Sequence, residues 1–367
     1  MMTRTSRSAA PSSPALAPHG GPRGGGGDAL IRIDLSTNVN PYGAPPSVLD
    51  AARAADLCAY PDPTSHDARS AAAMAWQRPI GEIAFGAGVS ELLPALFSAL
   101  LGRNNTVVLA SPLYGEYARA AQLVGARTLS VARRSTVPHI SRLFAAVRRF
   151  APKLLVVAAP GNPLGEAWTR DELAELADAA HARQCLLVID QSYDAFLDAP
   201  LGDPALPGHP AVMHFRSLTK DFAIAGLRAA YAIGPAAIIR RLEERRAPWP
   251  ASAPAQAAAE ATFASAAQAY VTRTTRALRE DVADFADALR AAGVSARKTD
   301  VHWVLCTLST AQANRLAHDA GIRVRTLDDH LLAGLARIVV PRRDQQAMIA
   351  RAVASALDTN SHDADTA

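Results

Sequence analysis

Lys220 is the residue of this chain best suited to covalent chemistry. Among 38 lysine and arginine residues only three are lysines: Lys153, Lys220 and Lys298. A guanidinium carries charge as well as an ammonium does, but only a primary amine forms a Schiff base with an aldehyde once its pKa is lowered. A surface lysine in an arginine-biased chain needs no function, so the interpretation depends on the residues that accompany it.

Two loops that precede Lys220 carry groups suited to a phosphate and a flat ring. In Gly86-Ala87-Gly88-Val89-Ser90-Glu91, glycines allow close backbone approach, and Ser90 lies where free amides at a helix N-terminus favour an anion. An ordinary turn with a helix cap explains this loop equally well. In the second loop Tyr114 follows a strand, where an aromatic ring stacks on a ligand or packs in the core.

Two further loops carry polar groups at strand ends. Pro160-Gly161-Asn162-Pro163 offers the amide of Asn162, although an ordinary turn also fits this composition. Asp190 follows the apolar run Leu186 to Ile189, and a carboxylate at the end of a buried strand is costly unless a cation pairs with it. A helix cap is the other interpretation of Asp190. Tyr193, three residues later, offers a phenol.

One cofactor has a partner for each of these groups. Pyridoxal phosphate carries an aldehyde for Lys220, a phosphate for the glycine loop and Arg228, a phenolic oxygen for Asn162 and Tyr193, and a pyridine nitrogen for Asp190. Each signal is weak alone. Together, in separate loops that follow strands, they predict a pyridoxal phosphate site.

The elements that would position these loops alternate between strand and helix. Strands are expected at 31–35, 83–85, 106–110, 128–132, 154–158 and 186–189, and helices at 92–101, 116–124 and 169–184, the last opened by a capping box of Thr169 and Glu172. This pattern predicts an α/β fold with a mostly parallel sheet and helices on both faces. Ligands of such sheets bind at the carboxyl ends of the strands.

The pattern changes after Arg240. An alanine-rich helical region is expected over 253–292, followed by strands at 303–307 and 336–340 and a helix at 345–357. The predicted organisation is a disordered segment (1–30), an arm that joins the small domain (31–70), a large cofactor-binding domain (71–245), a smaller α+β C-terminal domain (246–357) and a disordered tail (358–367).

Composition excludes several classes of function. The net charge of +4 comes from 38 basic and 34 acidic residues that are interspersed, so no nucleic-acid partner is expected. No apolar run is long enough for a membrane span. The three cysteines are far apart without metal spacing, which favours reduced thiols in a cytoplasmic protein and predicts no metal site.

The order of the chemical groups resembles that of the class I/II aminotransferases of pyridoxal phosphate fold type I, across residues 30 to 355. The resemblance implies that Lys220 holds the cofactor, Asp190 binds its pyridine nitrogen, and Tyr114 stacks on its ring. It assigns Asn162 and Tyr193 to the phenolic oxygen. The phosphate group and its loop are assigned to Gly88, Val89, Ser90, Ser217, Thr219 and Arg228.

The same resemblance extends to the partner subunit and the substrate. Tyr60, in Tyr60-Pro61-Asp62-Pro63, is similar to a tyrosine that reaches the phosphate of the neighbouring subunit, which implies a homodimer with shared active sites. Arg337 is similar to the arginine that grips the substrate carboxylate, or another anion in amino phosphates. The branch most similar is that of histidinol-phosphate aminotransferase and threonine-phosphate decarboxylase. The decarboxylase is suggested by His19-Gly20-Gly21, by residues 35–41 and by residues 217–228, and in that enzyme the equivalents of His19 and Asn38 help bind the substrate phosphate.

Three functions are therefore compared. The first is an aminotransferase for a small amino acid or amino-acid phosphate, with Lys220 moving the α-proton as a general base. The second is a decarboxylase of threonine phosphate with the same cofactor contacts, which an ordered His19 would favour. The third, a non-catalytic module of a transcription regulator, is not expected, because the roughly 30 residues ahead of Ile31 are too few for a winged-helix domain.

Overall fold

Short strands, most of them buried on both faces, build the large sheet of this protein. The computed structural model describes residues 19–22, 29–133, 139–202, 204–330 and 332–357. Seven strands lie in the order β2-β8-β7-β6-β5-β3-β4. Their bounds are Ile83–Gly86 (β2), Ala230–Ile233 (β8), Val212–Ser217 (β7), Leu186–Asp190 (β6), Leu154–Ala158 (β5), Thr106–Ser111 (β3) and Arg127–Ala132 (β4). All neighbouring pairs are parallel except those of β8, which confirms the mostly parallel sheet.

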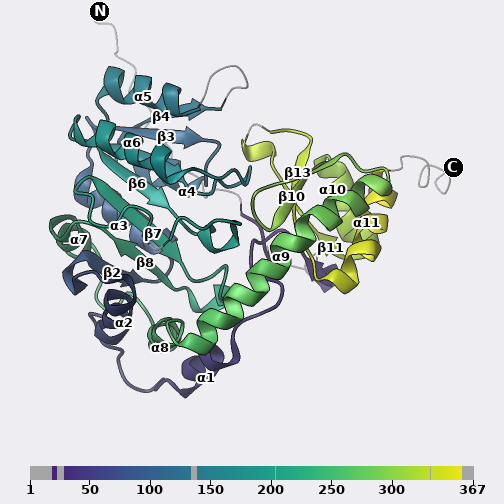
Figure 1. Cartoon of the computed structure of the whole chain (residues 1–367), viewed down its shortest axis with the longest axis horizontal. Helices are drawn as coiled ribbons and strands as arrows, with labels where there is room; N and C mark the ends of the chain where they lie inside the picture. Colours follow the sequence, from purple (N-terminus) through teal and green to yellow (C-terminus); the bar gives the residue numbers. More distant parts are fainter. Residues whose placement is uncertain (1–18, 23–28, 134–138, 203, 331, 358–367) are drawn as a thin grey trace, which may run out of the picture.

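Helices cover both faces of this sheet, as the apolar strands require (Figure 1). Along β5, Leu154 and Val156 pack with α3 (Val89–Leu100), α4 (Glu116–Leu123) and α7 (Ala236–Glu243). The alternate residues Leu155 and Val157 pack with α5 (His139–Phe150) and α6 (Arg170–His181). The capping box predicted at Thr169 and Glu172 is present at the start of α6.

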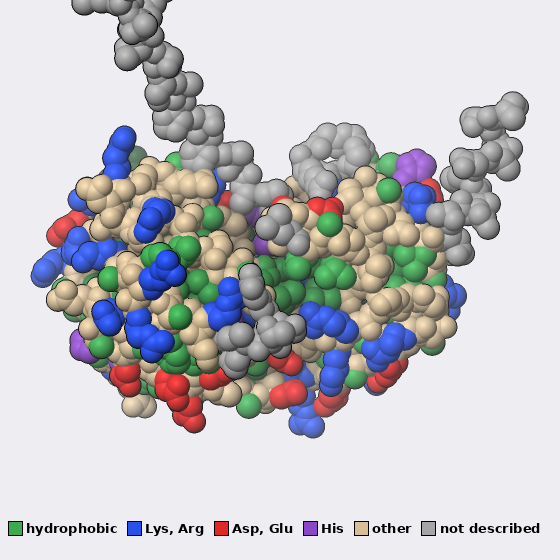
Figure 2. Space-filling model, turned by 90° about the horizontal axis from the view of Figure 1, so that it is seen from above, with side chains coloured by type: hydrophobic (Ala, Val, Ile, Leu, Met, Phe, Trp, Pro, Cys, Tyr) green, Lys and Arg blue, Asp and Glu red, His purple; other side chains and the backbone are tan. Residues whose placement is uncertain are grey.

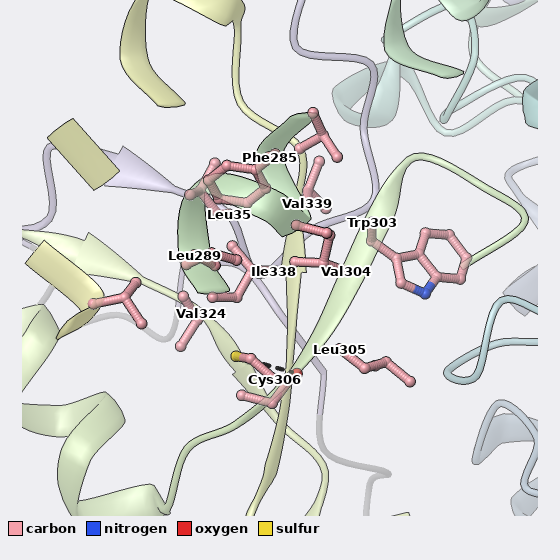
Figure 3. Close-up of a cluster of buried hydrophobic side chains, with 14 of the residues drawn as sticks. Leu35, Phe285, Leu289, Trp303, Val304, Leu305, Cys306, Val324, Ile338 and Val339 are labelled. Carbon is pink, nitrogen blue, oxygen red and sulfur yellow. Dashed lines mark hydrogen bonds between the residues drawn. The ribbon is translucent and has the colours of Figure 1, made fainter. Parts of the chain in front are cut away.

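The C-terminal part forms a second, smaller sheet. Its order is β12-β13-β10-β9, all antiparallel, with bounds Arg325–Thr326, Leu335–Val339, Trp303–Thr307 and Ala296–Lys298. The helices α10 (Thr310–Ala320) and α11 (Arg343–Leu357) pack on it. Figure 3 shows its core, where Leu35 of the N-terminal arm lies beside Phe285 and Val339.

Two segments connect the sheets. The arm contributes β1 (Ile33–Asp34), which pairs with β11 (Ile322–Arg323) of the small part. After α1 (Pro46–Ala54) and α2 (His66–Trp76), the chain enters the large sheet. The 27-residue helix α9 (Ser265–Ala291) then runs from one part to the other, with Val271 in one core and Leu289 in the other (Figure 1).

Two predicted elements differ from the observed ones. The strand expected over 31–35 is only two residues long, because the amides of Arg32 and Ile33 both donate to the Gly321 carbonyl and pairing starts there. The helical region expected over 253–292 is two helices, α8 (Ala253–Ala261) and α9. The break follows Thr262, whose hydroxyl donates to the Ala259 carbonyl.

Candidate active site

Lys220 follows β7, at the carboxyl end of the large sheet. Its side chain lines a cavity with Asp190, Tyr193 and Asn162, so the structure brings together groups from three separate loops. Burial, together with the nearby charges of Arg337 and Arg228, lowers the pKa of Lys220 from 10.5 to about 8, while Asp190 opposes this shift. A larger share of the amine is therefore neutral at physiological pH than in a free lysine.

The backbone around Lys220 is held from both sides. The Ser217 and Thr219 hydroxyls lie 2.8 Å apart in a hydrogen bond, and both residues line the cavity. The amide of Asn40 donates to the Lys220 carbonyl at 2.9 Å. The Asn40 side chain also donates to the Asp221 carbonyl at 3.1 Å, so the N-terminal arm fixes the turn that presents the lysine.

Asp190, the last residue of β6, is a buried carboxylate. It accepts hydrogen bonds from the Ser192 amide and hydroxyl and from the Tyr117 hydroxyl, the last at 2.8 Å. Within the described residues no cation lies at ion-pair distance from it. Burial raises the pKa of Asp190, and the hydrogen bonds from Ser192 and Tyr117 lower it in part. A cationic ring nitrogen would complete this environment.

Tyr117 is a site residue that sequence reasoning missed. It lies three residues after Tyr114, about one helical turn along α4, and the two rings meet edge to face at 6.3 Å. The three-residue spacing indicates that the side chains of Tyr114 and Tyr117 lie on the same side of the chain. The contact of Tyr117 with Asp190 depends on how α4 packs against β6, which the spacing does not reveal.

The glycine loop and Arg228 form a cradle at the start of α3. Gly88 has a φ of 89°, and a Cβ there would lie 2.7 Å from Arg228 Nη2. That same nitrogen donates to Ser90 Oγ at 3.1 Å. Val89 begins the helix, so the first amides of α3 point toward the cavity that Gly88, Val89, Ser90 and Arg228 line.

Arg337 connects the small sheet to Asn162 of the large one at this cavity. It is buried in β13, and its guanidinium donates to Asn162 Oδ1 at 2.6 Å and to the Ser36 carbonyl at 2.7 Å. Because an arginine only donates, the Asn162 oxygen is used, and its NH₂ group remains to donate to a ligand. Tyr193 and Asn38 line the same cavity, and neither amide atom of Asn38 has a hydrogen-bond partner among the described residues.

The cavity around these groups measures about 470 Å³ and extends beyond Lys220 toward the small sheet. Sequence reasoning missed Arg325, which lies directly across β12 and β13 from Arg337 and pairs with Asp329 at 2.6 Å. Glu116, at the start of α4, was also missed. The pairing of two short strands brings Arg325 to the site, and no motif in the sequence predicts that pairing.

His19 and Tyr60 occupy different places. His19 lines the cavity and hydrogen-bonds Glu116 Oε1 at 3.2 Å, although the segment 1–30 was predicted to be disordered; only 19–22, 29 and 30 of it are described. Tyr60 lies outside the cavity of its own chain. Its side chain is 82% exposed, with its ring 4.7 Å from that of Trp249.

The donors of this cavity fit pyridoxal phosphate. The Gly88 cradle and Arg228 suit its phosphate, the NH₂ group of Asn162 suits a phenolic oxygen, and the buried carboxylate of Asp190 suits a ring nitrogen. Tyr114 lines the same space and suits stacking.

Within the described residues no cluster of His, Cys, Asp and Glu is arranged to hold a metal, and no helix is long and apolar enough to cross a membrane. Lysine and arginine side chains are scattered over the face in Figure 2.

The fold and the cavity define a class, the pyridoxal phosphate enzymes of fold type I. The histidinol-phosphate aminotransferase of Sinorhizobium meliloti, solved with pyridoxal-5'-phosphate, superposes with a TM-score of 0.80 at 24% identity, over 90% of this chain and 94% of that one. The model of the family "Aminotransferase class I and II" matches residues 31–354. This chain belongs to that family and is a pyridoxal phosphate-dependent aminotransferase.

Two curated relatives agree with this assignment. A histidinol-phosphate aminotransferase of Erythrobacter litoralis is 30% identical over 346 residues, which cover 91% of this chain and 93% of the relative. An aromatic amino acid aminotransferase of Thermobifida fusca is 31% identical over 302 residues, which cover 79% and 82%. His19 lies at the cavity, as was expected of the decarboxylase of threonine phosphate, but both relatives are aminotransferases, and the comparisons favour transamination.

Proposed function

We propose that this enzyme transfers the amino group of an amino phosphate of the histidinol phosphate type to a 2-oxo acid, with Lys220 as the reactive amine. The observation that carries the proposal is that two adjoining cavities share Lys220, Asn162 and Tyr193. Asp190 lines one of these cavities, and the buried Arg337 and Arg325 line the other. A phosphate needs such cations near the reactive amine. The similarity to histidinol-phosphate aminotransferases supports the same substrate class.

Each residue of the site has a separate role in this reaction. When bound, pyridoxal phosphate supplies an aldehyde for the Lys220 amine and a ring that accepts electrons from the substrate α-carbon. Lys220, once neutral and free, removes the α-proton at its Nζ, since its lowered pKa places it near the working pH. Asp190 holds the ring nitrogen in its charged form. Arg337 fixes the anion of the substrate and thereby the orientation of the α-carbon.

Asn162 couples these contacts. Its oxygen accepts from Arg337 and its NH₂ group faces the cofactor side, so the position of the substrate anion and that of the ring are linked through one amide. Asn38 lines the substrate side of the cavity, where its amide lies next to Tyr193, and we assign it to the substrate phosphate. His19 lies beside the same space, in a hydrogen bond with Glu116.

We further propose a homodimer in which Tyr60 reaches the phosphate of the partner's site. The strong exposure of Tyr60, next to the half-exposed Trp249, supports a covered position in an assembly. The domain boundaries at residues 70 and 245 and a cytoplasmic location stay predictions.

The function is tested by product analysis. Purified protein loaded with pyridoxal phosphate is incubated with 2-oxoglutarate and either histidinol phosphate, single amino acids or threonine phosphate, and glutamate formation is followed. We expect histidinol phosphate to be the best donor. We expect Lys220→Ala to lower the turnover rate by about 10³-fold or more. The matched control Lys298→Ala, which removes an exposed lysine outside the cavity, keeps full activity. Carbon dioxide released from threonine phosphate, without glutamate, would contradict the proposal.

A further inference from the structure

His302 is a fully buried histidine in the loop before β10 that none of the contacts above explains. Its exposed fraction is 0%, and its ring stacks on Phe196 with centroids 3.6 Å apart and planes 21° from parallel. Tyr193 and Trp303 meet the same ring at 6.3 and 5.3 Å. The ring therefore lies within an aromatic cluster that includes one predicted cofactor contact, Tyr193.

The polar edge of the ring has one partner. His302 Nε2 lies 3.2 Å from the backbone carbonyl oxygen of Asn38. A carbonyl only accepts, so Nε2 carries the proton and donates, and Nδ1 is the unprotonated nitrogen. Among the described residues Nδ1 has no hydrogen-bond partner. The hydrogen bond to Asn38 is thus the polar contact that the structure gives this ring.

The charge state of the ring suits this position. Burial lowers the pKa of His302 to about 3, and Arg337 and Lys220 lower it too, so the ring is neutral at physiological pH. A neutral ring donates a hydrogen bond without adding a further positive charge beside Arg337 and Lys220. A lysine or an arginine at this position would donate as well, but would add that charge.

The segment that His302 holds carries the substrate side of the cavity. Asn38 lines the cavity but is only 2% exposed, and its buried amide lies close enough to Tyr193 to lower the pKa of that phenol. Two residues earlier, the Ser36 carbonyl accepts from Arg337. The backbone carbonyl of His302 accepts from the Val340 amide at 3.0 Å, next to the end of β13, which carries Arg337. The ring of His302 therefore connects the Asn38 segment to the Tyr193 turn, and its backbone carbonyl adds a contact next to the Arg337 strand.

We propose that His302 is a positioning residue for substrate binding, whose Nε2–H group holds the Asn38 carbonyl and so sets the place of the Asn38 amide against the substrate. The role rests on the proposed function, because it needs a substrate that reaches Asn38. The polar contact of the ring is with Asn38, and its contact with Tyr193 is apolar, so removal of the donor alone should leave the cofactor contacts in place. The role is also distinct from packing, because the apolar stacking on Phe196 does not require the donor.

Three substitutions separate the donor from the ring. His302→Phe keeps a ring for stacking but has no donor. His302→Gln loses the ring but places an amide nitrogen at about the reach of Nε2, whereas the amide of His302→Asn is too short. We expect His302→Phe and His302→Asn to raise KM for the amino donor three- to tenfold, with kcat within twofold, as the loss of one hydrogen bond predicts. His302→Gln returns KM to within twofold of the parent enzyme.

A matched control is available in His214 of β7. It is likewise buried, its Nε2 lies 3.4 Å from the Leu206 carbonyl, and its Nδ1 lacks a partner among the described residues. It lines a different cavity, away from Lys220. His214→Phe should change the melting temperature without a selective change of KM, whereas His302→Phe should change KM at unchanged affinity for pyridoxal phosphate.

The outcomes separate the two proposals. In an Asn38→Ala background, His302→Phe should have no further effect on KM, because the amide that it positions is gone. An unchanged KM in His302→Phe and His302→Asn overturns the positioning role. The role is also overturned if His302→Asn and His302→Gln raise KM and His302→Phe does not. The donor used is the one that the parent enzyme turns over best. If the parent enzyme does not turn over histidinol phosphate, the proposed substrate is wrong. The His302 variants are then compared with the amino donor that the parent enzyme does turn over.

Discussion

At the residue scale, the reactivity of this site is set by opposing effects on one amine. Burial and the cations Arg337 and Arg228 disfavour a charged Lys220, and the carboxylate of Asp190 favours it. The effects that lower the pKa are larger, so the pKa of Lys220 is about 8 instead of the usual 10.5. At pH 7 about a tenth of the amine is then neutral, against roughly one part in 3,000 for an ordinary lysine.

This balance predicts the pH dependence of cofactor attachment. Because only the neutral amine attacks an aldehyde, the rate at which the apoprotein reacts with pyridoxal phosphate should rise with pH and level off above a midpoint near pH 8. Stopped-flow absorbance between pH 6 and 10 measures it. Asp190→Asn removes a negative charge that favours the protonated amine, so its midpoint should move to lower pH. A midpoint near 10.5 in the parent protein would show that the environment does not perturb Lys220.

At the element scale, the ends of parallel strands explain why distant residues meet. Asn162 follows β5 and Asp190 ends β6, two neighbouring parallel strands, so their carboxyl ends lie at one edge of the sheet. The helix α3 adds its N-terminal amides at the same edge, where Gly88 lets Arg228 approach. The phosphate site is therefore a property of a helix start and a loop, not of one side chain.

A methyl group at Gly88 tests that site. Gly88→Ala places a Cβ 2.7 Å from Arg228 Nη2 and forces a side chain into a φ of 89°. We expect the dissociation constant of pyridoxal phosphate to rise about tenfold or more, a loss on the order of 1 to 2 kcal/mol. Fluorescence titration of the apoprotein measures it.

The control for this substitution is Gly81→Ala. A Cβ at Gly81 meets nothing within 4 Å, and its φ does not lie in the left-handed region. Its affinity for the cofactor should equal that of the parent protein. Equal affinity in Gly88→Ala and Gly81→Ala would remove the phosphate cradle from the description of the site.

The sequence predicts those parts of the site that depend on strand ends and local signals. Apolar runs locate β5 and β6, the capping pair at Thr169 locates α6, and the order of loops predicts that Asn162 and Asp190 meet. The sequence does not predict contacts that depend on how elements pack. Tyr117 reaches Asp190 through the packing of α4, and Arg325 reaches Arg337 through a two-residue strand.

At the scale of the whole molecule, the cavity needs residues from the arm, the large sheet and the small sheet. Asn38 comes from the arm, Lys220 from the large sheet and Arg337 from the small one, and α9 joins the two parts (Figure 1). Tyr60 is the one predicted cofactor residue that does not lie at this cavity in its own chain. A second copy would bring it to a site if the enzyme is a symmetric dimer.

Shared sites predict that two inactive chains restore one another. In a mixed dimer of a Lys220→Ala chain and a Tyr60→Ala chain, one site carries both defects and the other has an intact lysine from one chain and an intact tyrosine from its partner. Coexpression with two different tags isolates this dimer, which should show about half the activity of the parent dimer, while both variant homodimers are strongly impaired. If Tyr60 instead serves its own chain, each site of the mixed dimer keeps one defect. Activity then stays at the mean of the two homodimers, and the shared site is wrong.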